Sequence, residues 1–350
     1  MNRICILRLS ALGDCCHALS VVQYLRDKFP NSKVVWIIGK TEHQLFKGIS
    51  EVDFVVIDKS KLFRSLCDCF FELRKFRFDV LLNMHASATA NLISLSVRAK
   101  RKIGFDKERA RDGQIWFCTE SIRAIPNQHV AEGMMGFIAQ LNAETTSPKW
   151  QPLTLEPEEE QIRDHIDSER LTCLISPCSS QRYGDKYNRS WPSTNFIEII
   201  RYLSEQKGVQ TIITGGTSPI EKQYVDHFKS EELGKNVVNL MGRTTIRQMA
   251  SLIKMSDFVI SPDSGPAHIA TIMNKPVIGL YAMSNPDRTG PYKSKELLVN
   301  RYPEALSKFL GKSVVDVKWG QKVKTPKAMA LIQPADVMKK IDKLLATLVS

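Results

Sequence analysis

No apolar run in the sequence is long enough to cross a lipid bilayer. The longest, at residues 34–38 and 277–281, fall far below the roughly 18 residues that a membrane-spanning helix needs. The N-terminus, MNRICILRLSALGD, also lacks the apolar segment and the small-residue cleavage site of a signal peptide. These absences predict a cytoplasmic protein.

Metal-ligand spacing is missing among the cysteines. The eight cysteines include the neighbours Cys15 and Cys16 and the close pair Cys67 and Cys69, but their spacing matches no zinc-ligand pattern. A reducing cytosol disfavours disulfides. We therefore predict small buried thiols.

Acidic residues are too few to balance the basic ones. The chain has 49 Lys and Arg against 37 Asp and Glu, a net charge of +12, which favours an anionic partner such as a nucleic acid, a membrane surface or a phosphorylated substrate. Residues 98–111 hold seven cations against two carboxylates. This stretch is either a solvated surface or a docking patch for phosphate groups. Aromatic residues are sparse around it, which argues against single-stranded nucleic acid, since that ligand needs stacking platforms.

Strand-length apolar segments alternate with segments of helical periodicity along the whole chain. In the first half we predict strands at 3–9, 33–38, 54–57 and 80–82, and helices at 18–29, 61–76 and 129–141. In the second half we predict strands at 172–176, 209–214, 236–238, 258–261 and 276–281, and helices at 194–206 (capped by Ser193), 219–228, 246–255, 267–272 and 334–348. This alternation is typical of an α/β fold with parallel sheets.

A segment of weak periodicity divides the chain. Residues 143–157 (AETTSPKWQPLTLEP) carry three prolines and predict an interdomain linker. We expect two doubly wound, Rossmann-like domains at 1–150 and 151–333 that face a central cleft, followed by a helix at 334–350. Ligands of such sheets bind beyond the carboxyl ends of the strands, so the segments that follow strands are the candidate sites.

Asp14 follows the first predicted strand, in the segment Ser10-Ala11-Leu12-Gly13-Asp14. Gly13 permits a tight turn there. A carboxylate in this place can accept a proton from an attacking hydroxyl, or it can simply cap the following helix. The pattern leaves both interpretations open.

Three further segments follow strands in the second half. Ser179, Ser180 and Arg189 suit a diphosphate, because hydroxyls and cations stabilise its charge, although an exposed polar loop is the alternative. The turn at residues 215–221 is neither a GxGxxG fingerprint nor a P-loop; Glu221 can bind ribose hydroxyls there or merely belong to a strand-to-helix turn. The segment SPDSGPAH (261–268) opens a helix, whose N-terminus favours an anion. Its alternative is a capping Asp263 with a core-edge His268.

Four of these segments together resemble one known family. RLSALGD, RSWP, GGTSPIE and DFVISPDSGPAHIA are similar, in this order, to the heptosyltransferases of lipopolysaccharide core assembly, which are family 9 glycosyltransferases of the GT-B fold. The stretch IGFDKERARDGQIWF, followed by QHV, resembles the heptosyltransferase I branch, which uses a phosphorylated Kdo acceptor.

The resemblance implies an inverting transfer of L-glycero-D-manno-heptose from ADP-heptose to Kdo on lipid A. It makes Asp14 the general base and Arg189, where other members carry lysine, the cation that neutralises the leaving diphosphate. Donor binding then falls to Ser179, Ser180, Glu221, Asp263, Ser264, Gly265 and His268, and acceptor binding to Gly13, Arg98, Arg101, Arg109 and Arg111.

The same resemblance implies a peripheral enzyme at the inner face of the inner membrane. The expected partners are the nucleotide-sugar donor, Kdo-lipid A and the anionic membrane surface, with no nucleic acid. No obligatory metal or other cofactor is expected, because acidic ligands do not cluster beside the phosphate segments. The alternatives are a GT-B transferase or epimerase for another nucleotide-sugar, a basic nucleic-acid-binding protein, and an inactive scaffold.

Overall fold

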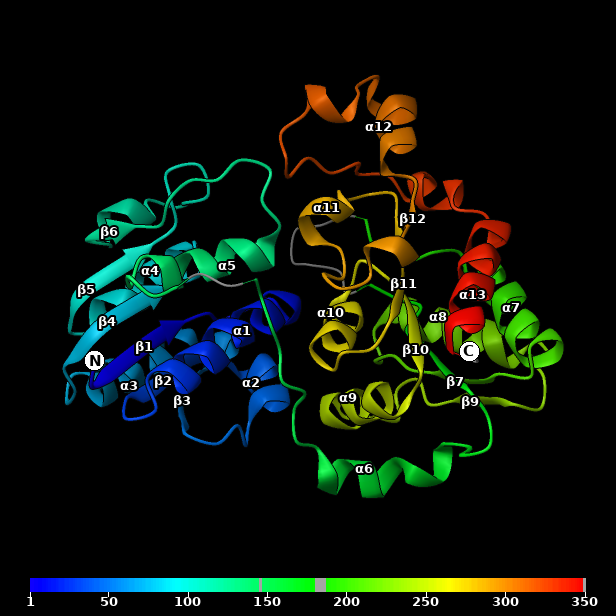
Figure 1. The fold of residues 1–350 in the computed structure, drawn as a ribbon, viewed down its shortest axis with the longest axis horizontal. Helices are drawn as coiled ribbons and strands as arrows, with labels where there is room; N and C mark the ends of the chain where they lie inside the picture. The colour runs from blue at the N-terminus through cyan, green and yellow to red at the C-terminus, as the bar shows by residue number, and fades with distance from the viewer. Residues whose placement is uncertain (145–146, 180–186, 349–350) are drawn as a thin grey trace. The chain divides into compact units, whose positions relative to one another are not determined.

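The computed structural model describes residues 1–144, 147–179 and 187–348. The chain forms two compact units, Met1–Leu153 and Thr154–Ser350, and each contains one six-stranded sheet (Figure 1). Every strand pair in these sheets is parallel. Parallel neighbours need long crossover connections, and helices supply most of them in both units.

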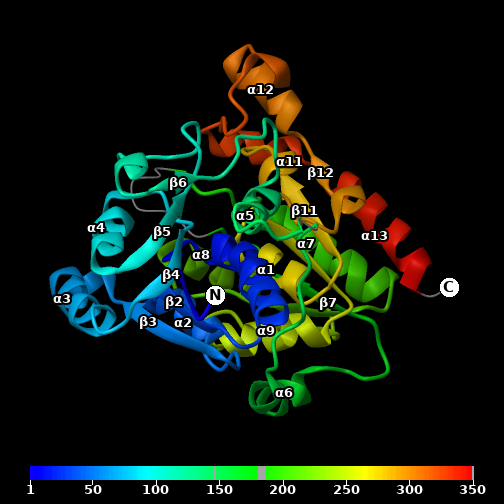
Figure 2. The ribbon, with the colours of Figure 1, turned by 60° about the vertical axis from the view of Figure 1, so that its left-hand side comes forward.

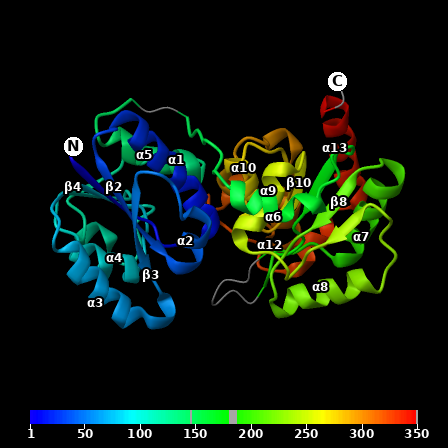
Figure 3. The same ribbon diagram turned by 90° about the horizontal axis from the view of Figure 1, so that it is seen from below.

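The sheet of the first unit has the strand order β3-β2-β1-β4-β5-β6. Its strands are β1 (Arg3–Leu7), β2 (Lys33–Gly39), β3 (Val52–Ile57), β4 (Phe78–Asn83), β5 (Ala99–Gly104) and β6 (Glu120–Ser121). Its helices are α1 (Leu12–Lys28), α2 (Lys40–Phe46), α3 (Leu62–Leu73), α4 (Ala88–Ser96) and α5 (Val130–Ala139). Helices α1 and α5 pack together on one face, while α3 and α4 bury their apolar sides against the other (Figures 2 and 3).

The sheet of the second unit has the order β12-β11-β10-β7-β8-β9. Its strands are β7 (Thr172–Ile175), β8 (Gln210–Ile213), β9 (Val237–Asn239), β10 (Phe258–Pro262), β11 (Val277–Tyr281) and β12 (Val299–Asn300). Its helices are α6 (Glu156–Ile162), α7 (Ser193–Arg201), α8 (Pro219–Lys229), α9 (Ile246–Met255), α10 (Gly265–Ile272), α11 (Pro286–Thr289), α12 (Tyr302–Leu310) and α13 (Pro334–Leu348). Numbered from its own first strand, each sheet has the order 3-2-1-4-5-6, the order of a Rossmann fold. The expected α/β, doubly wound fold is confirmed.

Several element boundaries differ from the expectation. Helix α1 begins six residues before the predicted start at 18, because Cys15 and Cys16 already pack into the core. Helix α4 and strand β5 were not predicted: ATANLISLS has little polar contrast, and AKRKIG carries three consecutive charged residues in a strand near the sheet edge. Ser193 is the first residue of α7 rather than its cap, which is Pro192.

Ion pairs attach helix α6, which follows the boundary between the units, to helix α9. Arg247 of α9 pairs with Glu158 of α6 at 2.6 Å, and Lys254 pairs with Glu159 at 2.7 Å. These contacts attach α6 to the second unit, so the change of unit falls before it. Helix α13 packs against α7 in the same unit.

The eight cysteines are all free thiols, and six of them are buried. This confirms the prediction for most of them; Cys67 and Cys118 are half-buried. In the part of the chain that the structure describes, no helix combines the length and the apolar character needed to cross a membrane.

Candidate active site

Each sheet has a point where the direction of winding changes. In the first unit this point lies between β1 and β4, and in the second between β7 and β10. Side chains that follow these four strands meet at one edge of their sheet, where doubly wound folds bind ligands. The predicted residues Asp14, Ser179, Arg189 and Asp263 all lie in such segments.

Asp14 lies in the first turn of α1 and is held there from two directions. Its Oδ2 accepts the amide of Ala11 at 3.3 Å and pairs with Nη2 of Arg8 at 2.5 Å. Arg8, which follows β1, is itself held by the segment that follows β4, because its Nη1 donates to the Met84 carbonyl at 2.5 Å. The ion pair and the helix N-terminus both stabilise a negative charge. Asp14 therefore serves as a local cap and is also a carboxylate, 27% exposed, that can accept a proton.

His85 follows β4 in the same cluster. The Leu9 amide donates to its Nδ1 at 3.1 Å, which leaves the ring proton on Nε2. Burial, together with the Arg8 guanidinium, lowers the pKa of His85 to about 3. The ring is thus neutral near pH 7, and it adds no second positive charge beside Arg8.

Two ionisable groups border this cluster. Burial raises the pKa of Glu42, and the nearby Asp14 charge acts in the same direction. Lys59 donates to the Ser10 hydroxyl at 2.7 Å. Gly13, expected beside the acceptor, lies with Asp14 in the first turn of α1.

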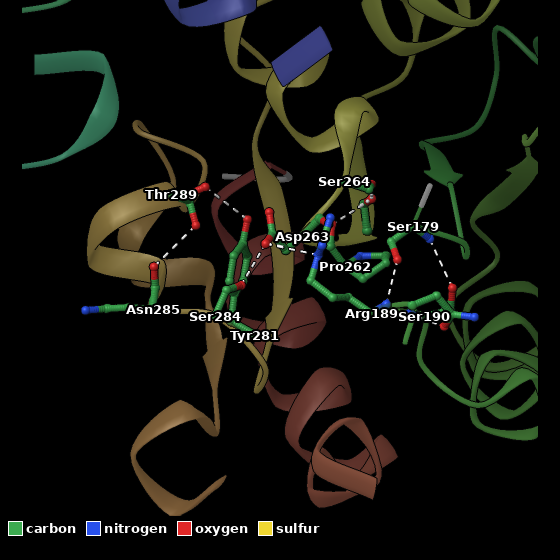
Figure 4. A network of polar contacts seen from close by, with 12 residues as sticks. Ser179, Arg189, Ser190, Pro262, Asp263, Ser264, Tyr281, Ser284, Asn285 and Thr289 are labelled. Carbon is green, nitrogen blue, oxygen red and sulfur yellow. Dashed lines mark hydrogen bonds and ion pairs between the residues drawn. The ribbon is translucent and has the colours of Figure 1, made fainter. Parts of the chain in front are cut away.

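In the second unit, Ser179 holds the backbone of the segment that carries Arg189. Its hydroxyl accepts the Arg189 amide at 2.6 Å, and its own amide donates to the Ser190 hydroxyl at 3.0 Å (Figure 4). Ser179 is buried. Its recorded contacts therefore position Arg189; Ser180, also predicted to bind the donor, lies outside the described residues.

The side chain of Arg189 is directed by Asp263 (Figure 4). Its Nε donates to the Asp263 carbonyl at 2.9 Å and lies 3.2 Å from Oδ2 of the same residue. The Ser284 hydroxyl donates to that Oδ2 at 2.7 Å. Within residues 1–144, 147–179 and 187–348, no partner is recorded for the two terminal nitrogens of Arg189. They form a planar fork of the kind that binds phosphate oxygens in pairs.

Helix α10 starts beside this pair. Ser264 is its N-cap, but the Ser264 hydroxyl bonds to the Ser261 hydroxyl at 2.8 Å instead of capping the helix. The first amides of a helix have no acceptor inside it, so Gly265 and its neighbours present donors and a positive dipole end. His268 lies on the same helix and is buried.

Glu221 makes contacts within its own turn. Its carboxylate accepts the amides of Gly216 at 2.5 Å and Ser218 at 3.0 Å, and the Ser218 hydroxyl at 2.5 Å. The Ser218 amide bond, together with the Glu221 amide that donates to the Ser218 hydroxyl, forms a capping box at the start of α8. The structure thus supports the turn interpretation of Glu221, and nucleotide contact stays a prediction.

The four predicted acceptor arginines differ in their surroundings. Arg101 forks onto Glu120 at 2.6 and 2.7 Å. Arg109 pairs with Asp106 and donates to Gln128 and to the Arg123 carbonyl at 3.1 Å. Arg98 and Arg111 are exposed. The first two therefore hold the protein's own segments together, while the other two present their charges to solvent.

Sequence reasoning missed Arg8, His85 and Ser284. Arg8 belongs to the segment RLSALGD but was assigned to the strand, and His85 and Ser284 follow strands that were predicted. The rule of strand ends, applied to every predicted strand, would have found His85 and Ser284, but it would have missed Arg8, because the observed strand β1 ends at Leu7 and not at Leu9 as predicted. Among the described residues, no three His, Cys, Asp or Glu side chains group in a way that could hold a metal ion.

Solved structures identify the fold. A family 9 glycosyltransferase from Veillonella parvula has a TM-score of 0.79 and 19% identity, covering 99% of this chain and 97% of its own. The Escherichia coli heptosyltransferase WaaC, solved with ADP, has a TM-score of 0.73 and 15% identity, covering 98% and 99%. The fold is that of the GT-B glycosyltransferases.

Sequence similarity identifies the family. The model of glycosyltransferase family 9 (heptosyltransferase) matches residues 68–336. The lipopolysaccharide core heptosyltransferase OpsX of Haemophilus influenzae is 36% identical over 348 residues, covering 97% of this chain and 96% of its own. The chain belongs to glycosyltransferase family 9, the heptosyltransferases, and is an enzyme, as the resemblance implied.

Proposed function

We propose that this enzyme transfers L-glycero-D-manno-heptose from ADP-heptose to Kdo, or phospho-Kdo, of lipid A, with inversion at the anomeric carbon. The observation that carries the proposal is the 36% identity, over nearly the whole chain, to a lipopolysaccharide core heptosyltransferase. A second relative that supports the proposal is a lipopolysaccharide heptosyltransferase 1 of Campylobacter coli, which is 18% identical over 98% of this chain.

The donor assignment rests on related enzymes and on local chemistry. The heptosyltransferase WaaC has been solved with ADP and with ADP-2-deoxy-2-fluoro heptose. In this chain, Arg189 and the start of α10 offer a guanidinium and helix amides to one diphosphate. Both are groups that bind phosphate oxygens. We assign donor binding to the second unit and acceptor binding to the first.

The proposed reaction is a single displacement. An acceptor hydroxyl oxygen forms a bond to the anomeric carbon as the bond from that carbon to the diphosphate oxygen breaks. The hydroxyl proton passes to Asp14, and ADP departs with the electron pair. Arg8 holds the carboxylate of Asp14 in place, while Arg189 and the dipole of α10 stabilise the charge on ADP. With these cations available, we propose that turnover needs no metal ion.

On the acceptor side, exposure favours Arg98 and Arg111 as contacts for anionic groups of the acceptor. Arg101 and Arg109 already have carboxylate partners, so we propose that they support these segments. Because the acceptor is a lipid, we also propose that the enzyme works at the cytoplasmic face of the inner membrane.

The direct test is incubation with ADP-heptose and truncated Kdo-lipid A, with and without a Kdo phosphate, read by mass spectrometry. We expect addition of one heptose, in the presence of a chelator as well. If no acceptor gains a heptose while another nucleotide-sugar is consumed, the donor assignment is wrong.

The Asp14→Ala and Asp14→Asn variants test the proposed base. Loss of a positioned base should lower kcat about 10²- to 10⁴-fold, while the Kd for ADP stays unchanged because Asp14 belongs to the unit that we assign to the acceptor. Asp27→Asn, an exposed carboxylate on the last turn of the same helix, is the matched control. Turnover at the wild-type rate in both Asp14 variants would refute the assignment.

A further inference from the structure

Helices α3 and α4 expose large apolar side chains to solvent. Phe63 and Phe71 of α3 are 82% and 70% exposed, and Leu92 and Leu95 of α4 are 52% and 60% exposed. Trp116, in the short turn Gln114–Trp116, is 85% exposed. Monomeric proteins rarely leave such side chains grouped on one surface unless it binds a partner.

These side chains belong to one side of the first unit. Helices α3 and α4 contact each other and share a core cluster on the same face of the sheet (Figures 2 and 3). The turn with Trp116 is tied to the start of α4 through Asp112, which accepts the Ala88 amide at 3.0 Å and whose carbonyl accepts the Asn91 side chain at 2.8 Å. We call the outward surface of Leu62–Leu73, Ala88–Ser96 and Gln114–Trp116 the α3–α4 surface.

Charge around α3 is strongly positive. Residues 59–77 carry six cations against two carboxylates, and all six cations are exposed: Lys59, Lys61, Arg64, Arg74, Lys75 and Arg77. The guanidinium of Arg74 lies over the Phe70 ring, 4.7 Å from its centre. Helix α4 contains no charged residue. Bulky apolar side chains together with exposed Lys and Arg side chains are typical of surfaces that lie in the headgroup region of anionic bilayers.

A second copy of the chain fits this surface less well. A symmetric dimer places the same patch on both partners, and that would bring the two cationic segments 59–77 together. A bilayer of anionic lipids instead supplies opposite charge for the cations and an apolar layer for the aromatic rings.

We propose that the α3–α4 surface docks the enzyme on an anionic lipid bilayer, with Phe63, Phe71 and Trp116 entering the headgroup layer. The proposal deepens the proposed function, since it specifies how an enzyme with a lipid acceptor meets its substrate, and it rests on that function for its meaning. Binding to vesicles, however, can be measured without any turnover.

The test uses the full chain and vesicles of phosphatidylethanolamine with phosphatidylglycerol, compared with vesicles of phosphatidylcholine alone. We expect co-sedimentation with the first and little with the second. The triple variant Phe63→Ser, Phe71→Ser, Trp116→Ser should bind the anionic vesicles at least about tenfold more weakly. Lys61→Glu and Lys75→Glu should each weaken binding to the anionic vesicles by more than roughly fivefold. Neutralising one cation accounts for the factor of about five, and the negative charge that replaces it adds to the loss. Val315→Ser, 92% exposed in the second unit, is the matched control and should bind normally.

Turnover separates docking from chemistry. The docking variants should lose activity on Kdo-lipid A in vesicles and keep wild-type kcat on a water-soluble acceptor without acyl chains. Vesicle binding at the wild-type level in both the aromatic and the lysine variants would overturn the proposal. The proposal would also be overturned if the wild-type protein were a dimer and these variants dissociated it without changing vesicle binding. If the wild type uses neither acceptor, the proposed function fails, and the vesicle measurement still decides the docking surface.

Discussion

Arg8 is the residue on which the polar cluster of the first unit depends. It connects the segment after β1 to the segment after β4, because it contacts both Asp14 and the Met84 carbonyl. A neutral His85 beside it avoids a second buried cation. The orientation of the proposed base thus depends on two side chains that take no part in the proposed transfer of the proton.

The pH dependence of folding reports on His85. In the folded chain its pKa is about 3, while an unfolded histidine has a pKa of about 6.5. Between these values the unfolded chain binds a proton that the folded chain does not, so the unfolding free energy falls as the pH falls, by up to about 1.4 kcal/mol per pH unit. We expect His85→Asn to flatten this slope between about pH 6.5 and 4.5.

Urea denaturation at a series of pH values measures that slope. Asparagine can still accept the Leu9 amide, so the variant keeps the local hydrogen bond. His165→Asn in the second unit controls for the loss of a histidine elsewhere. An unchanged slope in His85→Asn would show that His85 is not buried in its neutral form.

The elements of the second unit converge on one ion pair. Segments that follow β7, β10 and β11 contribute Arg189, Asp263 and Ser284, and the neighbouring helix α10 adds its N-terminus. Both the carbonyl and the carboxylate of Asp263 contact Nε of Arg189. These contacts indicate that Asp263 orients the guanidinium, a positioning role that differs from the direct donor contact predicted from the sequence.

Asp263→Asn tests this arrangement at the level of the loop. The side chains of Arg189 and Asp263 are only 10% and 15% exposed, so removing the carboxylate leaves a nearly buried cation, at a cost of about 3–5 kcal/mol of unfolding free energy. Ser284→Ala removes one hydrogen bond to the same carboxylate and should cost about 1 kcal/mol. Chemical denaturation measures both changes.

Kinetics separate the positioning role from stability. We expect Asp263→Asn to lower kcat with ADP-heptose more than Ser284→Ala does, because the guanidinium loses the carboxylate that fixes its direction. Equal losses of stability and of kcat in the two variants would contradict the proposed order of importance.

At the scale of the whole molecule, the two units should respond differently to nucleotide. A ligand stabilises the part that binds it, by about 2.7 kcal/mol at a concentration of 100 times its Kd. We therefore expect ADP to slow amide hydrogen exchange after β7 and β10, and to leave β1 and β4 unchanged. Mass spectrometry of peptides after exchange measures this directly.

UDP and GDP serve as controls for that measurement. Weaker protection with both than with ADP is expected for an ADP-heptose enzyme. If ADP slowed exchange in β1 and β4 and not after β7 and β10, the assignment of the donor and acceptor units would be reversed. If UDP slowed exchange more than ADP does, the alternative of another nucleotide-sugar donor would be favoured.

The sequence by itself determined the alternation of strands and helices, the α/β class of both units and the family. Helices α9 and α13 have the predicted bounds, because helical periodicity is a local property of the chain. The same locality explains the failures at α4 and β5, whose sequences carry weak or misleading contrast. The segments that hold Asp14, Arg189 and Asp263 could also be found, because they follow predicted strands.

Only the tertiary structure decided which side chains meet. Arg8 and Met84 are separated by 76 residues, and Arg189 and Asp263 by 74, so no local pattern could pair them. Folding likewise divided the basic stretch, giving Arg101 and Arg109 carboxylate partners and leaving Arg98 and Arg111 exposed. The physical reason is that the crossover connections of a parallel sheet decide which strands become neighbours. Which strands become neighbours depends in turn on the packing of the whole unit.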